Sequence, residues 1–585
     1  MRGGGIIFSA RHLRFGFGGV LLVASCFVAQ TSLAQSTSGW NGGSCAGATG
    51  GGGGGGAISI TGTGGAGAAA IGCGGGGGGG AGVTGGNGGA TGSAAGGAGG
   101  ASAGTDGSPG DNFYFSSGGG GGGGGGTHGA VVTTSTSNSG IVAGGNGGAG
   151  GSPMVAVPGA GGGGGGGGYG VVIDGSGLTY TNSGTVRGGA GGNGGFSVFN
   201  NGGYGGFAGA GAVFTGSGGT LVNSGSIAGG AGGTAGSGVF YGLPGLGGVG
   251  VVGANLSITN SGSITGGLAG DGSMRARAIY FNGGINTLEL QAGSVITGAV
   301  VGNYNDTLRL GGAGDGTFDV SAIGTQYTGF TTFVKTGTSM WTLTGTTLAF
   351  TPWSIEQGTL AISSDDNLGN NFASMSPISF NGGTLKFLAA LSGNRPITLN
   401  AGGGTFYTNG NDVTLAGAIG GAGDLTKVGA GTLALTGISS YTGATNINAG
   451  TLEVDGSIAS SSNVIVNSGA TLSGTGVVDP ATTTIMAGGT LAPGNASNPA
   501  GMLTITGNLA FQSAATYRVN VNPSAASFVN VTGSATLGGA TVNAVFSNAS
   551  YVNKLYSILA AAGGVSGTFA SSVVSTNLPA GFQTS

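Results

Sequence analysis

Residues 425–454 read LTKVGAGTLALTGISSYTGATNINAGTLEV, and this stretch decides the fold. A Gly-Thr-Leu sequence begins one apolar run at Gly431 and a second at Gly450, about 20 residues later. Within each run aliphatic residues alternate with other residues, as Leu433 and Leu435 do, and a period of two is typical of a half-buried strand. The stretch therefore predicts short strands separated by glycine turns.

Similar strand starts recur through the second half of the chain. They lie at Gly337, Gly358, Gly383, Gly404, Gly431, Gly450, Gly469 and Gly489. A coil of about 20 residues accommodates the two or three short strands that one circuit of a parallel β-helix needs. We therefore predict an all-β protein with a right-handed parallel β-helix (solenoid). The two longest steps, from Gly358 to Gly383 and from Gly404 to Gly431, are expected to contain inserted loops.

A second repeat occupies the first half of the chain. Asn-Ser-Gly begins at Asn138, Asn182, Asn223 and Asn260, so the starts are about twice as far apart as those of the second half. Each block contains short β-type runs separated by glycine, which predicts two strand-bearing turns of the solenoid per block. Because asparagine tolerates the left-handed backbone conformation, we expect these asparagines to form tight turns.

Charged residues test the strand phase. Glu289, Arg309, Lys386 and Glu453 each stand between two apolar residues, mostly leucines. A half-buried strand sends alternate side chains to opposite faces, so we expect these charges in solvent and the apolar neighbours in the core. Helical periodicity is absent over any comparable length.

Glycine dominates the composition, with 152 glycines in 585 residues and only 5% charged residues. Residues 35–170 are a glycine-rich low-complexity segment, and we expect flexible or loosely stacked loops there because glycine loses the most backbone entropy on ordering. The unbroken runs are Gly50 to Gly56, Gly74 to Gly80, Gly118 to Gly126 and Gly161 to Gly168. No Gly-Lys-Ser/Thr follows a run, which argues against a phosphate-binding loop.

The beginning of the chain, up to Ala34, predicts a secretory signal peptide. A basic start with Arg11 and Arg14 precedes an apolar stretch, and Ser32-Leu33-Ala34 supplies the small residues for cleavage after Ala34. The apolar stretch is shorter than the roughly 20 residues that span a bilayer, which argues against a membrane anchor. A lipoprotein signal at Cys26 is the alternative, although apolar residues continue beyond it.

Removal of the signal leaves a chain with more acidic than basic residues and no basic stripe. Neither nucleic-acid binding nor electrostatic binding to a membrane is therefore expected. Cys45 and Cys73 remain in the exported chain, where they either form a disulfide or stay as two thiols.

Residue types that carry catalysis are scarce. His128 lies alone in a glycine-rich stretch, and residues 311–315 contain one copy of a calcium-binding nonapeptide-like sequence that needs tandem copies. Asp365-Asp366 and Arg275-Ala276-Arg277 would suit a lyase-like groove only if the fold brought them together. We therefore predict no catalytic, cofactor-binding or metal-binding residues, no cofactor, and no enzymatic activity.

Residues 425–437 and 441–452 resemble the autotransporter-associated β-strand repeat. A diverged copy is present at residues 333–345 and 357–360, and residues 488–495 and 556–569 are similar to the stem that precedes the membrane barrel in such proteins. The resemblance covers about residues 280 to 585 and implies a type V secretion protein, with a β-helical passenger displayed outside the cell.

The resemblance also implies a C-terminal barrel in the outer membrane, but the residues up to Ser585 contain none of its alternating segments. We expect either a fragment or a truncated product, at the cell surface or secreted, and outer-membrane associated if a barrel follows. The implied role is adhesion or surface structure, with an unknown ligand on a host or neighbouring cell. The alternatives are a secreted glycine-rich matrix protein, because of residues 188–195, and a β-helical carbohydrate-active enzyme.

The expected organisation has four parts. Residues 1–34 are the signal peptide, 35–170 the glycine-rich segment, 171–332 the Asn-Ser-Gly β-helix, and 333–585 the autotransporter-associated repeats with the stem. We expect the regular coils around Leu433 and Val454 to supply most of the stability, and the glycine tracts to supply almost none.

Overall fold

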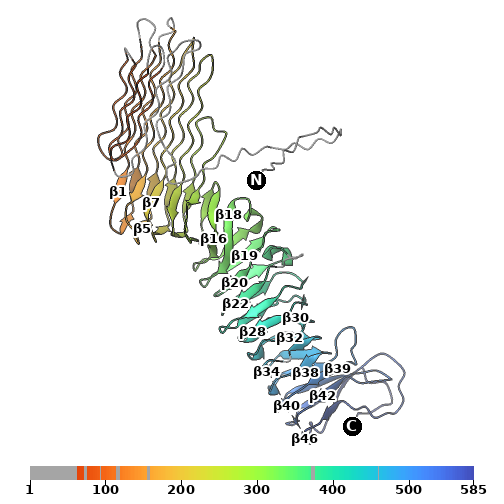
Figure 1. Ribbon diagram of the computed structural model, residues 1–585. Helices are drawn as coiled ribbons and strands as arrows, with labels where there is room; N and C mark the ends of the chain where they lie inside the picture. Colours follow the sequence, from red (N-terminus) through yellow and green to blue (C-terminus); the bar gives the residue numbers. More distant parts are fainter. Residues whose placement is uncertain are drawn as a thin grey trace, which may run out of the picture. The chain divides into compact units, whose positions relative to one another are not determined.

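The computed structural model describes residues 62–70, 75–91, 94–113, 119–153, 158–370, 376–458 and 460–584, which include 47 strands and two short 3-10 helices. Strands from successive coils pair in parallel and stack into long sheets (Figure 1). Ala130–Val132 pairs in this way with Val171–Ile173, and Thr541–Phe546 with Val574–Thr576. The predicted all-β solenoid is confirmed. The signal peptide, Cys45 and Cys73 lie outside the described residues. No helix in the described ranges is both long and apolar enough to cross a membrane.

Each coil of the first half contains three short strands, and strands at equal positions stack. The first position has β1 (Ala130–Val132), β4 (Val171–Ile173), β7 (Ala212–Ser217), β10 (Val251–Ala254) and β13 (Ile279–Phe281). The second has β2 (Thr136–Asn138), β5 (Thr179–Asn182), β8 (Thr220–Asn223), β11 (Ser257–Asn260) and β14 (Thr287–Leu290). The third has β3 (Ile141–Ala143), β6 (Thr185–Arg187), β9 (Ser226–Ala228), β12 (Ser263–Thr265) and β15 (Val295–Thr297).

These strands change two expectations about the first half. An Asn-Ser-Gly block is one coil of three strands rather than two turns of the solenoid, because the rest of the block leaves the coil as a glycine-rich excursion. Strands also stack at β1, upstream of Val171 and inside the segment that the sequence presents as low complexity, and isolated parallel bridges precede them.

The asparagines of the repeat form a buried ladder. The Asn138 Nδ2 donates to Asn182 Oδ1 at 2.8 Å, the Asn182 Nδ2 to Asn223 Oδ1 at 2.8 Å, and the Asn223 Nδ2 to Asn260 Oδ1 at 2.7 Å. None of the four has a positive φ, so the expected left-handed turns are wrong. Asparagine serves here because its amide carries both a donor and an acceptor, which lets identical side chains bond in series from coil to coil.

Two sheets connect successive coils of the second half. The first of them is continuous with the strands at the first two positions of the first half. One extends through β16 (Val300–Leu310), β18 (Tyr327–Lys335), β20 (Trp353–Ile355), β22 (Ile378–Phe380), β25 (Ile397–Leu399) and β28 (Ile419–Gly421). The other, with twelve strands, has β17 (Gly316–Asp319), β19 (Met340–Thr344), β21 (Thr359–Ile362), β23 (Thr384–Phe387), β26 (Gly404–Tyr407), β29 (Leu425–Val428), β31 (Thr445–Ile447), β34 (Asn463–Val466), β37 (Thr482–Ile485), β40 (Asn508–Phe511), β43 (Ala535–Thr536) and β46 (Val565–Ser566).

Two further sheets complete the later coils. The nine-stranded sheet has β24 (Leu391–Gly393), β27 (Val413–Leu415), β30 (Thr432–Leu435), β32 (Gly450–Val454), β35 (Ala470–Gly474), β38 (Thr490–Pro493), β41 (Thr516–Val521), β44 (Thr541–Phe546) and β47 (Val574–Thr576). The five-stranded sheet has β33 (Ser457–Ile458), β36 (Val477–Val478), β39 (Met502–Ile505), β42 (Phe528–Val531) and β45 (Leu559–Ala561). The 3-10 helices are η1 (Val320–Ala322) and η2 (Asp365–Leu368).

The long step between Gly404 and Gly431 is not a coil with an inserted loop. The glycine starts up to Gly404 lead into the twelve-stranded sheet, whereas those from Gly431 onward lead into the nine-stranded sheet. The sequence motif hides this change, because turns into both sheets use a left-handed glycine, with φ of 62° at Gly358 and 88° at Gly431. The other long step, from Gly358 to Gly383, does contain an excursion, which includes η2.

The core follows the predicted strand phase. Leu433, Leu452 and Val454 are fully buried, and Leu433 pairs in register with Leu452. Arg309 is exposed between buried Leu308 and Leu310, while the other three predicted outward charges are partly exposed. Stacked aliphatic and aromatic side chains thus form one continuous core cluster from Val171 to Ala544.

The glycine-rich tracts form a closely packed array rather than loose loops. After its third strand a coil sends a tract outward and a second tract back, such as residues 188–197 and 201–211 (Figure 1). The amides of Gly188, Gly191 and Gly194 donate to the outward tract of the next coil at 2.9 Å. The neighbouring amides of Gly189, Gly192 and Gly195 donate to the return tract of the preceding coil at 2.7–2.8 Å.

The three-residue period of these bonds is that of the polyproline II conformation, in which every third residue shares a face. Two residues of each triplet face other tracts and must be small, while the third, such as Asn193, faces solvent. An added Cβ at Gly206 would overlap the carbonyl oxygen of Gly165 in a neighbouring tract. Glycine is therefore required by close approach of backbones, and the tracts contribute a hydrogen-bonded layer that the sequence analysis did not anticipate.

We expect Gly206→Ala to destabilise the array by about 1–3 kcal/mol, because the new methyl group overpacks a site closed by backbone. Hydrogen exchange of the amides in residues 188–250 measures the effect. Gly283→Ala is the matched control, since its Cβ would meet only the Ala254 Cβ at 3.8 Å. Equal protection in both variants would show that the tracts are not closely packed.

Candidate functional site

His128 is a packing residue in the structure. It is 2% exposed, and its Nδ1 accepts a hydrogen bond from the Tyr169 amide at 3.0 Å. Its ring stacks on the Tyr169 ring with 4.8 Å between centroids. In the described part of the chain no group of three or more His, Cys, Asp and Glu residues is placed to hold a metal ion.

The structure does not bring Asp365 and Asp366 together with Arg275 and Arg277. The Arg275 Nη1 donates to the Gly266 carbonyl at 2.7 Å, and the Arg277 guanidinium lies 4.3 Å from the centre of the Tyr280 ring. Both arginines belong to the excursion before β13, whereas Asp365 begins η2 and pairs with Arg395. These four residues are therefore not brought together as a lyase-like groove would require.

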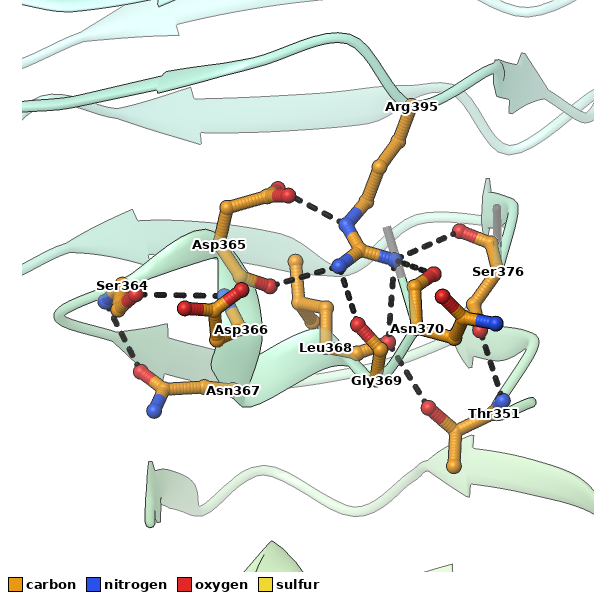
Figure 2. A network of polar contacts seen from close by, with 10 residues as sticks. All are labelled: Thr351, Ser364, Asp365, Asp366, Asn367, Leu368, Gly369, Asn370, Ser376 and Arg395. Atoms are coloured by element: carbon orange, nitrogen blue, oxygen red, sulfur yellow. Dashed lines mark hydrogen bonds and ion pairs between the residues drawn. The ribbon is translucent and has the colours of Figure 1, made fainter. Parts of the chain in front are cut away.

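Arg395 is the centre of a buried polar network (Figure 2). It is 3% exposed, and its Nε donates to Asp365 Oδ1 at 2.8 Å. Its Nη1 and Nη2 donate to carbonyl oxygens of η2 and of the residues after it, which belong to Asp365, Leu368, Gly369, Asn370 and Ser376. The guanidinium thus satisfies the carbonyls that a short helix leaves without partners at its end.

Little open space adjoins Arg395 among the described residues. The void beside it has a volume of about 10 Å³ and is lined mainly by apolar residues such as Ile362 and Phe387, so it holds at most one water molecule. A larger hollow of about 330 Å³ lies at Ser547, Asn548, Ala549, Asn577 and Pro579, none of which is titratable in the physiological range. Arg395 therefore holds the excursion in place through its bonds to the Asp365 side chain and to backbone carbonyls.

Lys335 and Lys427 occupy equivalent positions and are fully buried. The Lys427 Nζ donates to the carbonyls of Val428, Gly429 and Ala449 at 2.7–3.2 Å, and Lys335 makes the corresponding bonds to Thr336, Gly337 and Gln357. Each lysine thereby joins its own glycine turn to the turn of the next coil. Burial lowers the pKa of both amines to about 8.

The excursion array carries the most distinctive surface. On its outward tracts polar side chains bond the next coil, as where the Asn146 Oδ1 accepts from the Ala190 amide at 2.8 Å and the Asn193 Oδ1 from the Thr234 amide at 2.9 Å. On the return tract of residues 240–250 the solvent-facing positions are mostly apolar, including Phe240 and Leu243. Phe196 and Leu268 of the outward tracts are exposed as well, so apolar side chains reach solvent from both kinds of tract.

Arg395→Lys should destabilise the η2 excursion by about 2–3 kcal/mol, because an ammonium cannot replace the planar set of five donors. We expect faster proteolytic cleavage within residues 363–370 and a lower unfolding midpoint. Arg309→Lys, on an exposed position of β16, is the control and should leave both unchanged. Similar cleavage of the two variants would contradict this role of Arg395.

The buried lysines predict a pH dependence of stability. Their folded pKa of about 8 lies below the ordinary 10.5, so between pH 8 and about 10 the unfolded chain binds more protons and the free energy of unfolding rises. At higher pH the trend reverses, because burial raises the pKa of Tyr180 and Tyr327 to about 12 and unfolded tyrosines ionise first.

Denaturant unfolding between pH 7 and 11 measures this profile. The double variant Lys335→Met, Lys427→Met should lack the rise, whereas Lys386→Met, which removes a partly exposed amine, should keep it. A rise that persists in the double variant would assign the effect to other groups.

Comparison with known proteins agrees with this geometry. Residues 333–362 and 425–454 match the family described as Passenger-associated-transport-repeat, and each match contains one of the buried lysines. The chain is also 32% identical over 139 residues to the Adhesin BmaC autotransporter of Brucella suis biovar 1 (strain 1330). That alignment covers 24% of this chain and only 4% of the relative. The two repeats and this similarity together support the identification of the chain as an autotransporter passenger.

Proposed function

We propose that the chain is a non-enzymatic adhesive or structural passenger that is exported and displayed at the bacterial surface. The observation that carries the proposal is the continuous stack of coils with two transport repeats and a projecting array of glycine-rich tracts. The similarity to an autotransporter adhesin indicates contact with another surface as the role. Its ligand would lie on a host cell or on a neighbouring bacterium.

The coil architecture suits export of an unfolded chain. Each coil contacts its neighbours through short parallel ladders, such as β30 with β32, so folding can proceed coil by coil outside the membrane. Regular aliphatic stacking around Leu452 and Leu472 provides a place where this process can start. A passenger of this kind needs neither an energy source nor a cofactor to complete its fold.

The ionisable groups support a non-catalytic role because the buried ones serve the backbone. Arg395 binds carbonyls of one excursion, and Lys335 and Lys427 bind carbonyls of glycine turns. Arg309 faces solvent from a strand whose neighbouring leucines are buried. A catalytic centre needs acid and base groups around a cavity, and these residues are arranged for stability instead.

Display and adhesion can be tested in cells that produce the protein. Antibodies against residues 188–250 should label intact bacteria, and protease added to the intact cells should remove this labelling. Beads coated with purified protein should bind host or bacterial cells more than beads coated with an unrelated β-solenoid. Labelling only after lysis would overturn display. If the protein cleaved a polysaccharide and one carboxylate substitution abolished this cleavage, the protein would be an enzyme instead.

A further inference from the structure

The sequence Phe-Asn-Gly-Gly occurs twice, at residues 281–284 and 380–383, and the fold treats the two copies differently. Asparagine before glycine is the pair at which a protein backbone most readily modifies itself. The glycine nitrogen attacks the side-chain carbonyl carbon of the asparagine, and the absence of a Cβ on glycine leaves this approach open. The attack requires a glycine amide that is free to lose its proton and an asparagine side chain that can turn toward it.

In the second copy both groups are held. The turn follows β22, and the Gly382 amide donates to the Gly403 carbonyl at 2.8 Å. The Asn381 Oδ1 accepts a hydrogen bond from the Gly402 amide at 3.0 Å. Both hydrogen bonds must break before the Gly382 nitrogen can attack the Asn381 side chain, and the cost of this local opening protects the pair.

In the first copy neither group is held. The turn follows β13, and among the described residues the Gly283 amide and the Asn282 Oδ1 have no hydrogen-bond partner. The Asn282 Oδ1 is also buried, so the side chain gains hydrogen bonds to water by turning outward. The turn is open at Gly283, because an added Cβ would meet only the Ala254 Cβ at 3.8 Å, and Gly284 is exposed.

The other asparagine-glycine pairs of the described chain resemble the second copy. In each of them the glycine amide donates to a backbone carbonyl at 2.7–3.1 Å. These amides belong to Gly88, Gly147, Gly194, Gly202 and Gly410. Within the described ranges, Asn282 and Gly283 are therefore the pair whose reacting groups are least restrained.

We propose that Asn282 is a site of spontaneous deamidation and isomerisation in the folded protein. The Gly283 nitrogen forms a bond to the Asn282 Cγ, the Cγ–Nδ2 bond breaks, and the side-chain nitrogen leaves as ammonia with the proton of the Gly283 amide. Water then adds to one of the two carbonyl carbons of the resulting succinimide and opens the ring to aspartate or isoaspartate. This modification site goes beyond the proposed adhesive function and does not depend on it.

Either product changes the turn between β13 and β14. A carboxylate at position 282 joins a turn in which the buried Asp306 already accepts hydrogen bonds from the Asn286 amide and side chain, and like charges repel. Isoaspartate also lengthens the backbone between these two strands, both of which pair in register with the preceding coil. Modification therefore weakens the contact of this coil with its neighbours.

The test is incubation of the purified, folded full chain in mildly alkaline buffer, followed by unfolding, tryptic digestion and mass spectrometry. Trypsin cleaves after Arg277 and Arg309 and releases residues 278–309, and fragmentation of this peptide assigns the modified asparagine. We expect Asn282 to deamidate about ten-fold faster than Asn381, because the second copy must first open. Equal rates at Asn282 and Asn381 would overturn the proposal.

Two controls separate the effect of the fold from that of the local sequence. In denaturant Asn282 and Asn381 should react at similar rates, since both lie in Phe-Asn-Gly-Gly. A preference for Asn282 that persists in the unfolded chain would contradict protection by the fold. The variant Gly283→Ala should slow modification of Asn282, because its methyl group hinders the attack, and should leave the unfolding midpoint unchanged.

Discussion

Parallel stacking of coils is the constraint on which the rest of the structure depends. Neighbouring strands lie about 4.8 Å apart, so each side chain inside the solenoid lies directly above its equivalent in the next coil. Leucine therefore meets leucine from Leu433 through Leu452 and Leu472 to Leu491, and asparagine meets asparagine in the first half. In the glycine tracts the backbones approach so closely that no side chain larger than a hydrogen atom fits between them. One rule thus selects three different residue types.

Turns and excursions interrupt the backbone hydrogen bonds between coils. Buried cations bind the carbonyl oxygens that are left without backbone partners. A left-handed glycine turn leaves carbonyl oxygens without strand partners, and Lys335 and Lys427 bind three such oxygens each. The η2 excursion leaves more of them, and Arg395 has enough donors for the whole group. Carbonyl dipoles offset the cost of burying these charges, although the lowered pKa of both lysines shows that the compensation is incomplete.

The strand phase of the second half could be predicted from local periodicity, since Leu433 and Val454 lie inside as expected. The same rule, applied strictly, also places Lys427 inside, because it follows Leu425 by two positions, but a charged side chain argues for the opposite face. The asparagine ladder required knowledge of which residues stack, and the contact of Arg395 with Asp365 joins residues 30 apart in the chain. A glycine run looks alike in sequence whether it is loose or closely packed, because the contacts that decide this come from other tracts.

Side chains of the glycine array differ in what they contribute to the fold. The polar side chains Asn146 and Asn193 bond amides of the following coil, so the array needs them for its own cohesion. Backbone bonds already hold the return tracts, and Phe240 and Leu243 point away from them into solvent. Stability would favour small or polar residues at these positions, since exposed apolar surface is unfavourable in water. The exposed positions of this return tract therefore carry side chains that the fold does not require, in contrast to Asn146 and Asn193, whose bonds join one coil to the next.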